Sequence, residues 1–206
     1  MPRLTQIKET KKGRLALFLD GEFAFSLDED TFAAAHLHED YELEPWQVEQ
    51  LRKQSDTRRA LDKAMDYLSL RDHASGELYQ KLCRKFDAHS AAYAVARAGE
   101  LGLLDDAGFA RRRAAELLRK RKSRREILND LAAKGIDRDT AAEAVESLYD
   151  ETEEGEDPEM ASVQALLERQ YAAKLAAGKR DQVAAALARR GFSHAIIREA
   201  LAAYED

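Results

Sequence analysis

The chain repeats one helical pattern three times, and this repetition limits its possible folds more than any other feature of the sequence. Three segments align, beginning near Ser75, Ser123 and Lys179. In each segment an apolar residue stands four positions before a leucine; the pairs are Leu78 and Leu82, Ile127 and Leu131, and Val183 and Leu187. The copies are separated by 49 residues (Leu78 to Ile127) and 56 residues (Ile127 to Val183). These separations are too long for a single helix pair and favour a three-helix module.

Glycines and capping residues indicate where the helices of these modules end and begin. The second and third copies share Leu-x-x-(Lys/Arg)-Gly-(Ile/Phe), so Gly135 and Gly191 should follow helix ends in the left-handed conformation. The first copy lacks this glycine, and its helix must end by another device. Helix starts are predicted at five capping residues, which are Asp106, Ser123 (with Glu126), Asp139, Asp157 and Ser193.

The predicted fold class is therefore mainly α, with three tandem trihelical repeats preceded by a small N-terminal β-meander and two helices. Composition agrees, because 35% of the residues are charged and Gly and Pro are few, which favours amphipathic helices over sheets. The predicted domains are an N-terminal extension at 1–57, repeats at 58–104, 105–150 and 158–206, and an acidic linker at 151–157.

The N-terminal segment carries the only strong strand signal. Apolar runs flank Asp20-Gly21, a dipeptide suited to a type I′ hairpin turn, and LTQIKET should add a third strand. Helices are expected at about 28–37 and from Pro45 onward, with Trp46 packed onto the sheet. The face predicted to meet this cover comprises Ala16, Phe18, Phe23, Phe25 and Leu27.

A basic run begins within the second repeat, although the whole chain has a formal net charge of −6. Residues 111 to 125 read RRRAAELLRKRKSRR, with nine Lys or Arg in fifteen positions. On a helix beginning near Ala107, four residues share the side that should face the core. They are Ala110, Ala114, Leu117 and Leu118. Most basic residues then lie outside, where Glu116 is placed to neutralise Arg112 and Lys120 by i,i+4 pairing.

This run predicts a surface for polyanions or for an acidic protein groove, because so many like charges repel one another on an ordinary solvated helix. The alternative is a solvated face made of good helix formers. Binding to phosphates should be independent of sequence and weaken steeply with salt. Base reading is disfavoured because base-stacking aromatics, Asn and Gln are missing from the run. The candidate binding residues are Arg111, Arg112, Arg113, Arg119, Lys120, Arg121, Lys122, Arg124 and Arg125.

An acidic stretch follows the second repeat, with seven Asp or Glu among residues 150 to 159. It lacks an apolar period and is predicted to be a solvated linker. We also consider the hypothesis that it folds back onto the basic run and competes with DNA. Neutralising four of its acids should then tighten DNA binding; they are Glu151, Glu153, Glu154 and Glu156.

Motifs of catalysis and metal binding are missing from the sequence, so no catalytic residue, metal ligand or cofactor is predicted and an enzyme is not expected. His36 and His38 stand two apart in a polar segment and are read as surface residues. The single cysteine excludes an intrachain disulfide. No apolar run is long enough to span a membrane and no signal peptide is recognisable, so we expect a cytoplasmic protein, and we expect it to be a monomer.

Three stretches together resemble the RecX family, bacterial proteins that regulate the recombinase RecA. The first resembles the family's Tyr-Leu-Ser-x-Arg signature and its Ser and Glu-Leu continuation, here Tyr67, Leu68, Ser69, Arg71, Ser75, Glu77, Leu78 and Leu82. The second resembles the step into the next module, here Leu104, Asp105, Asp106, Phe109 and Ala110. The third comprises Ile127, Leu131, Lys134, Gly135 and Ile136. Residues 1–50 resemble an extension that only some members carry.

The resemblance implies three trihelical repeats in an elongated, curved array that binds in the groove of the RecA–DNA filament. It also implies modulation, usually inhibition, of the recombinase, ATPase and coprotease activities of RecA, with weak sequence-independent affinity for single- and double-stranded DNA. Two alternatives come from the residues alone. One is a general DNA-binding or nucleoid module using the basic helix, and the other is a helical interaction scaffold without DNA affinity.

Overall fold

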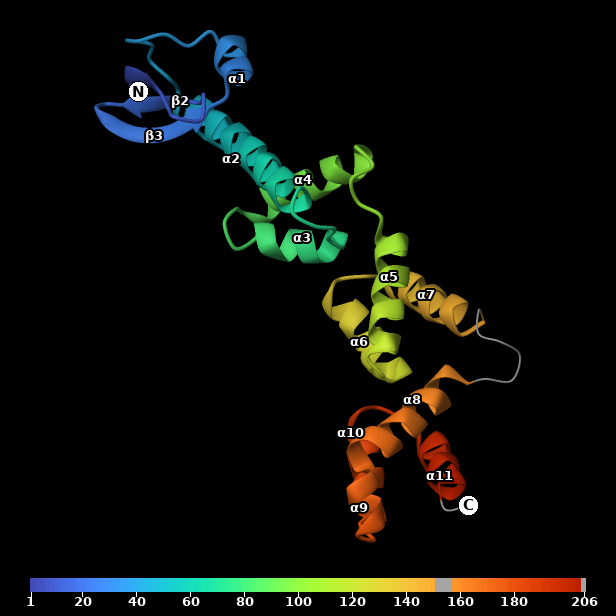
Figure 1. Cartoon of the computed structure of the whole chain (residues 1–206). Helices are drawn as coiled ribbons and strands as arrows, with labels where there is room; N and C mark the ends of the chain where they lie inside the picture. Colours follow the sequence, from blue (N-terminus) through green and yellow to red (C-terminus); the bar gives the residue numbers. More distant parts are fainter. Residues whose placement is uncertain (151–156, 205–206) are drawn as a thin grey trace. The chain divides into compact units, whose positions relative to one another are not determined.

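The computed structural model describes residues 1–150 and 157–204 and is mainly α-helical, with one small sheet near the N-terminus (Figure 1). The predicted fold class is confirmed in this respect. The chain forms two compact units, one of residues 1–72 with 78–103 and one of residues 73–77 with 104–206. The predicted acidic linker lies outside the described residues except for Asp157. The predicted domain boundaries stay predictions.

The sheet of the first unit is an antiparallel meander of β1 (Leu4–Glu9), β2 (Leu15–Leu19) and β3 (Glu22–Leu27). Asp20 and Gly21 connect β2 to β3 with φ angles of 51° and 87°. Two consecutive positive φ angles are what a type I′ turn requires, so the predicted hairpin is confirmed.

A bulge in β3 changes which side chains face the core. Phe18 pairs with Phe23, but the preceding residue of β2, Leu17, pairs with Phe25, so β3 holds one extra residue, Ala24. Such an insertion turns the residues on either side of it to opposite faces. Phe25 is accordingly buried with Leu17, whereas Phe23 is 61% exposed and meets the Phe18 ring edge to face. The single face predicted for Ala16, Phe18, Phe23, Phe25 and Leu27 is therefore wrong.

Two helices follow the sheet, α1 (Glu29–Ala34) and the long α2 (Pro45–Leu68). Leu51 of α2 is buried in the same apolar cluster as Leu17, with Val48 packed at its edge. Trp46 is 64% exposed, and the prediction that it packs onto the sheet is wrong. The reason is angular, since two residues along a helix are about 200° of rotation apart and Val48 already faces the sheet.

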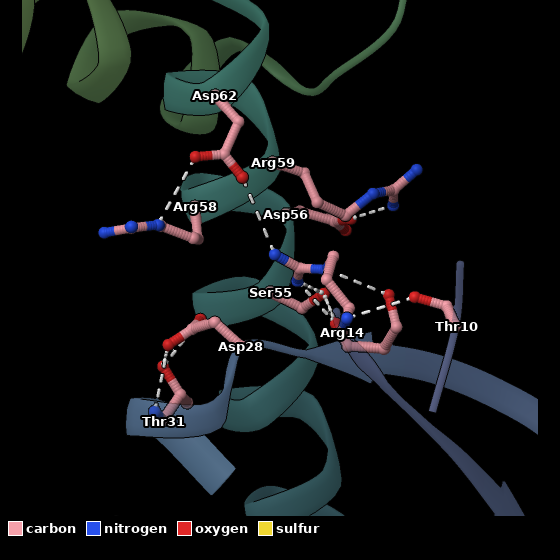
Figure 2. A network of polar contacts seen from close by, with 10 residues as sticks. Thr10, Arg14, Asp28, Thr31, Ser55, Asp56, Arg58, Arg59 and Asp62 are labelled. Atoms are coloured by element: carbon pink, nitrogen blue, oxygen red, sulfur yellow. Dashed lines mark hydrogen bonds and ion pairs between the residues drawn. The ribbon is translucent and has the colours of Figure 1, made fainter. Parts of the chain in front are cut away.

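Arg14 fastens the sheet to α2 (Figure 2). Its Nη2 donates to the carbonyl oxygen of Ser26 at 2.6 Å, and the Ser55 hydroxyl of α2 donates to that same oxygen at 2.5 Å. The Arg14 Nη1 lies 3.7 Å from Asp62 Oδ2, about two turns beyond Ser55 on α2. Burial lowers the pKa of Arg14, against the opposing influence of Asp28 and Asp62. The partly buried guanidinium is thus held by acceptors from both elements.

The helices after residue 45 follow the threefold pattern. The first repeat uses α2, α3 (Ser75–Leu82) and α4 (Ala88–Glu100), and the second α5 (Asp106–Arg119), α6 (Arg124–Ala133) and α7 (Arg138–Asp150). The third uses α8 (Pro158–Leu166), the π-helix η1 (Leu167–Tyr171), α9 (Ala172–Ala176), α10 (Arg180–Arg189) and α11 (His194–Ala203). Helix α2 continues through residues 57 and 58, so it serves both the sheet and the first repeat.

Each repeat buries its aligned apolar residues. All six residues of the three predicted pairs, from Leu78 to Leu187, have no solvent exposure. In the second unit, the second and third repeats have separate apolar clusters, one centred on Ile127 and Leu131 and one on Val183 and Leu187. The repeated sequence pattern therefore corresponds to a repeated core. None of the described helices is both long and apolar enough to cross a membrane.

The predicted helix ends at Gly135 and Gly191 are confirmed. Their φ angles are 76° and 94°, and the next residue in each case donates its N–H back to the buried leucine carbonyl: Ile136 to Leu131 at 3.1 Å and Phe192 to Leu187 at 3.3 Å. This is the Schellman arrangement. In the first copy, α3 ends instead in tight turns, with the N–H groups of residues 85 and 86 donating to the Leu82 carbonyl.

The capping predictions are confirmed at Ser123, Asp157 and Ser193, whose side chains accept from the N–H groups of the first turn. They are wrong by one and two residues elsewhere. Asp105, not Asp106, caps α5 by accepting from the Gly108 N–H at 2.8 Å. At α7, Asp137 rather than Asp139 accepts from the first-turn N–H groups.

Candidate nucleic-acid interface

Helix α5 presents the first part of the basic run to solvent. Ala110, Ala114 and Leu117 are buried and Leu118 packs against the same cluster, as the helical pattern predicted. Three of the candidate arginines on this helix are exposed, namely Arg111, Arg112 and Arg119. They stand on a helix whose opposite side is fixed in the core, so their charge is displayed from a rigid support.

Arg113 has a different environment. Its Nε and Nη2 donate to the two carboxylate oxygens of Asp130 on α6 at 2.8 and 2.9 Å, and its Nη1 donates to Glu116 at 2.9 Å. These hydrogen bonds raise the pKa of Arg113 and lower the pKa of Asp130. Glu116 pairs with Arg113, a partner that spacing did not suggest, and its predicted pairing with Lys120 is confirmed.

The basic run changes direction at the end of α5. Lys120 terminates the helix, Arg121 follows with a φ of 58°, and the Lys122 N–H donates back to the Leu117 carbonyl at 3.1 Å. This is the same Schellman ending that glycine forms elsewhere in the chain, here with an arginine in the left-handed position. Lys122 Nζ pairs with Glu126 Oε1 at 3.0 Å. Arg121 is exposed.

The last two candidates lie in the first turn of α6, where they contact the third repeat. The backbone N–H of Arg124 donates to Glu159 Oε1 at 3.1 Å, and its guanidinium lies 5.5 Å from the centre of the Tyr149 ring. The Arg125 guanidinium donates to the Ala188 carbonyl oxygen at 3.5 Å. Burial raises the pKa of Tyr149 to about 12 and also raises the pKa of Glu159. These two arginines therefore help to join repeats.

The nine predicted residues thus comprise three without an ion pair to a described residue, five with identified structural partners, and Arg112. Within residues 1–150 and 157–204, no carboxylate forms an ion pair with Arg111, Arg119 or Arg121. Arg112 is exposed and has an interaction of its own. The group with structural partners comprises Arg113, Lys120, Lys122, Arg124 and Arg125.

A contact that the sequence reasoning missed recurs in the second unit. The Ser75 N–H, in the first turn of α3, donates to Asp106 Oδ1 at 2.8 Å, just as the Arg124 N–H in the first turn of α6 donates to Glu159. Ser75 and Arg124 occupy equivalent positions, 49 residues apart. Asp106 is used in this contact, which explains why Asp105 caps α5.

Gly135 and Gly191, the glycines that follow the ends of α6 and α10, take part in the same recurring contact. A methyl group built on Gly76 would lie 2.5 Å from the Gly135 Cα, and one on Gly191 would lie 2.7 Å from Ser123 Oγ. The next residue of α3, Glu77, is buried and accepts from Lys134 Nζ at 2.8 Å. The sequence does contain both halves of this contact, which are the first turns of α3 and α6 and the later Lys134-Gly135 and Arg190-Gly191 pairs. One sequence does not reveal, however, which first turn packs against which glycine.

The histidines remain apart from any metal-binding arrangement in the described part of the chain, where no group of three or more His, Cys, Asp or Glu could hold an ion. His38 Nδ1 contacts the Glu39 carbonyl oxygen at 2.9 Å, and its ring meets Tyr41 edge to face. These are local contacts of a turn.

Comparison with known families finds two matching models. Residues 60–97 match "RecX, first three-helix domain" and residues 105–145 match "RecX, second three-helix domain". Among curated relatives, "Regulatory protein RecX" of Bacillus subtilis (strain 168) is 30% identical over 211 residues, covering 98% of this chain and 76% of the relative. The protein of the same name from Lactobacillus johnsonii is 33% identical over 154 residues, covering 73% of this chain. The matched region spans 57% of that longer relative.

Solved structures give the same fold. The protein described as "Crystal structure of regulatory protein RecX" superimposes with a TM-score of 0.67 at 20% identity and covers 96% of this chain and 98% of its own. The Lactobacillus salivarius RecX structure has a TM-score of 0.60 at 20% identity and covers 73% of this chain. At this level of identity, the likeness concerns the fold alone.

Proposed function

Because the chain belongs to the RecX family, we propose that it binds the RecA filament on DNA and inhibits its recombinase, ATPase and coprotease activities. The relatives are named regulatory proteins, and the proposed role needs no catalytic group or cofactor of this chain. The chain acts as a monomer in the cytoplasm. Its affinity for free single- and double-stranded DNA is weak and independent of sequence.

One observation supports the placement of the DNA or filament contact. Arg111, Arg119 and Arg121 are exposed around α5 without an ion pair to any described residue, on a helix whose other side is buried. Cations that are held apart and unneutralised on a rigid helix release counterions when a phosphate backbone approaches. Arg112 extends this surface, while Arg113 positions α5 against α6 rather than contacting phosphate.

The proposed mechanism uses the repeats as steps along the filament groove. Within the second unit, the second repeat is joined to the third by the contact between the Arg124 N–H and the Glu159 carboxylate, so these two repeats are held together. A repeat protein of this kind suits a helical partner, because its own units follow one another at regular intervals. Occupying the groove would oppose filament growth and the conformational cycle that ATP hydrolysis requires.

The test is titration of DNA-stimulated RecA ATPase with the full chain at two salt concentrations. We expect inhibition at amounts well below one molecule per RecA subunit, with a weaker effect at the higher salt. Replacing Arg111 and Arg119 by Glu should raise the half-inhibitory concentration about tenfold or more, since each lost phosphate contact weakens binding and a reversed charge repels. Arg189→Glu with Arg198→Glu changes the charge equally on exposed residues of the third repeat and serves as the control.

The second candidate is a general DNA-binding or nucleoid module, which the basic surface of α5 supports by itself. Such a protein would inhibit RecA only by occupying free DNA. Its inhibition would then require enough protein to coat the DNA and would disappear when RecA filaments are assembled first. Inhibition of preassembled filaments at substoichiometric amounts would exclude this candidate. If preassembled filaments are not inhibited, the filament proposal is excluded instead.

A further inference from the structure

A basic pocket of about 240 Å³ lies between the second and third repeats, at the place where the basic run turns from α5 into α6. Its walls include Lys120, Arg121 and Lys122 from the second repeat, and Arg169 of η1 and Arg190 at the end of α10 from the third. One acidic residue, Glu126, also lines it. Lys120 pairs with Glu116 and Lys122 with Glu126, so the positive charge of the pocket comes from Arg121, Arg169 and Arg190, which form no ion pair with any described residue. Of these three, only Arg121 belongs to the basic run.

The ion pair that belongs to the recurring contact is not made at this pocket. Glu77 and Lys134 pair at 2.8 Å where α3 meets the end of α6. One repeat later, the equivalent residues are Glu126 and Arg190, 49 and 56 positions further on. Glu126 accepts instead from Lys122, and its other carboxylate oxygen is buried without a hydrogen-bond partner among the described residues. Glu126 and Arg190 therefore both line the pocket without pairing with each other.

Arg190 is held in place by other contacts. Its Nη2 donates to Gln170 Oε1 at 2.9 Å, and its guanidinium lies 5.8 Å from the centre of the Tyr171 ring. Both partners belong to η1, the π-helical turn Leu167–Tyr171, which also carries Arg169. Single π-helical turns occur frequently at functional sites. Here the turn supplies one cation to the pocket and orients another.

Arg121 adds a second sign of function. The helices α4, α6, α9 and α10 all end with a glycine in the left-handed conformation, namely Gly102, Gly135, Gly178 and Gly191. Helix α5 alone of these five ends with an arginine there, at a φ of 58°. A non-glycine residue in this conformation is strained, and such strain is concentrated at functional sites. The chain thus has an arginine at a pocket-lining position where glycine would remove the backbone strain.

We propose that this pocket binds a phosphate group, from the DNA backbone or from a free phosphate compound. Arg121 supplies charge from the second repeat and Arg169 from the third, and the planar Arg190 can donate two hydrogen bonds to one phosphate. The volume equals the share of about eight water molecules in the liquid, which is enough for a phosphate and its nearest waters. The DNA source rests on the proposed function, since it extends the same basic surface into the junction between repeats.

The experiment compares three forms of the full chain: the natural protein, Arg121→Gln with Arg169→Gln, and a control, Arg189→Gln with Arg198→Gln. The control removes the same charge from exposed residues that do not line the pocket. Two ligands are titrated at low salt without RecA. Binding of a labelled oligo(dT) is followed by fluorescence anisotropy, and binding of inorganic pyrophosphate by calorimetry.

We expect the pocket variant to bind the oligonucleotide about tenfold more weakly and to reduce the salt slope by about two, with less than about a threefold loss in the control. This outcome identifies backbone phosphate as the ligand. Loss of pyrophosphate binding in the pocket variant, with oligonucleotide affinity like the control, would support the phosphate site and identify a free phosphate compound as its ligand. Equal effects of the two variants on both ligands would overturn the proposal.

Two single substitutions test whether misfolding, rather than loss of the pocket's charge, explains weaker binding. Arg121→Gly should raise the melting temperature by about 2–4 °C by relieving the left-handed backbone, yet weaken phosphate binding. Glu126→Gln removes the opposing charge and should tighten binding about threefold or more. A stabilised Arg121→Gly protein with unchanged affinity for both ligands would contradict the proposal. These binding experiments contain no RecA, so they test the pocket separately from the proposed function. If the chain fails to inhibit the RecA ATPase but the pocket variant still binds phosphate more weakly than the control, only the proposed function is contradicted.

Discussion

Arg113 of α5 and Asp130 of α6 form a two-pronged ion pair, with Nε to Oδ2 at 2.8 Å and Nη2 to Oδ1 at 2.9 Å. The two side chains are 27% and 28% exposed, so solvent screens the pair only in part. A parallel pair of hydrogen bonds between a guanidinium and a carboxylate fixes orientation as well as distance. One arginine of the basic run is thereby committed to holding two helices together.

Replacing Arg113 by Gln should lower the free energy of unfolding by about 1–2 kcal/mol, because Asp130 loses a partly buried charged partner. Arg119→Gln removes the same charge from an exposed position of the same helix and should change stability by less than about 0.5 kcal/mol. Urea unfolding followed by circular dichroism measures both. Equal stability of the two variants would show that the ion pair contributes nothing.

The same pair predicts an acid dependence. Hydrogen bonds from Arg113 hold the pKa of Asp130 below its ordinary value. The resulting stability is complete above the ordinary aspartate pKa of about 3.9 and is lost as the pH falls through the lowered pKa of the folded state. Asp130→Asn should therefore flatten the decline of unfolding free energy between about pH 5 and pH 2. A decline as steep as that of the natural protein would contradict this assignment.

Gly135 should tolerate alanine much less well than Gly178, although both follow a helix end with similar φ angles of 76° and 69°. A methyl group at Gly135 would lie 2.6 Å from the Gly76 Cα, whereas one at Gly178 has open space around it. Gly178→Ala should cost about 1 kcal/mol for the left-handed backbone alone. Gly135→Ala should cost about 2 kcal/mol or more on top of that, because two backbones must separate. Chemical denaturation of the two variants isolates the close approach.

Glu159 should make the protein less stable as the pH rises. Burial raises its pKa, so its stabilising contribution is complete below the ordinary glutamate pKa of about 4.3 and is lost as the pH rises through the raised value. Glu159→Gln should raise stability at pH 7, since the amide oxygen can still accept from the Arg124 N–H. Glu159→Ala leaves that N–H unpaired and should be less stable than Glu159→Gln. The reverse order in thermal melts at pH 7 would refute this.

Arg14 should be more sensitive to lysine substitution than Arg3. Arg14 reaches acceptors on both the sheet and α2 from a partly buried position, and a lysine cannot reproduce its forked pair of donors. Arg3 contacts Asp40 at the surface, with both side chains more than half exposed. We expect Arg14→Lys to cost about 1–2 kcal/mol and Arg3→Lys less than about 0.5 kcal/mol. Hydrogen exchange of the β2 and β3 amides measures each effect locally.

Much of the fold could be read from local pattern. The apolar pairs from Leu78 to Leu187, the left-handed glycines Gly135 and Gly191, and the Asp20-Gly21 turn all depend on residues close together in sequence. Helix periodicity, capping and turn chemistry act over a few residues, so one sequence is enough to reveal them. The errors at Asp106 and Asp139 are of one or two residues, within a run of competing acids.

Long-range pairing was not predictable in this way. Phe23 was assigned to the core because nothing local marks the Ala24 bulge, and Trp46 was assigned to the sheet because nothing local says which face of α2 packs. The basic run shows the same limit, since spacing placed Arg113 on the outer surface of its helix. Its neutralisation depends on Asp130, which lies on another helix.

The amino-acid order of this chain therefore sets the number of repeats, the main helix boundaries and the concentration of positive charge in residues 111 to 125. Packing between helices assigns each of those charges its role. Arg113 is neutralised by Asp130, Arg124 and Arg125 contact the third repeat, and Arg121 lines a pocket that also contains Arg169 and Arg190. The physical reason is that ion pairs and pockets form between residues brought together across the chain, over separations that local pattern does not record.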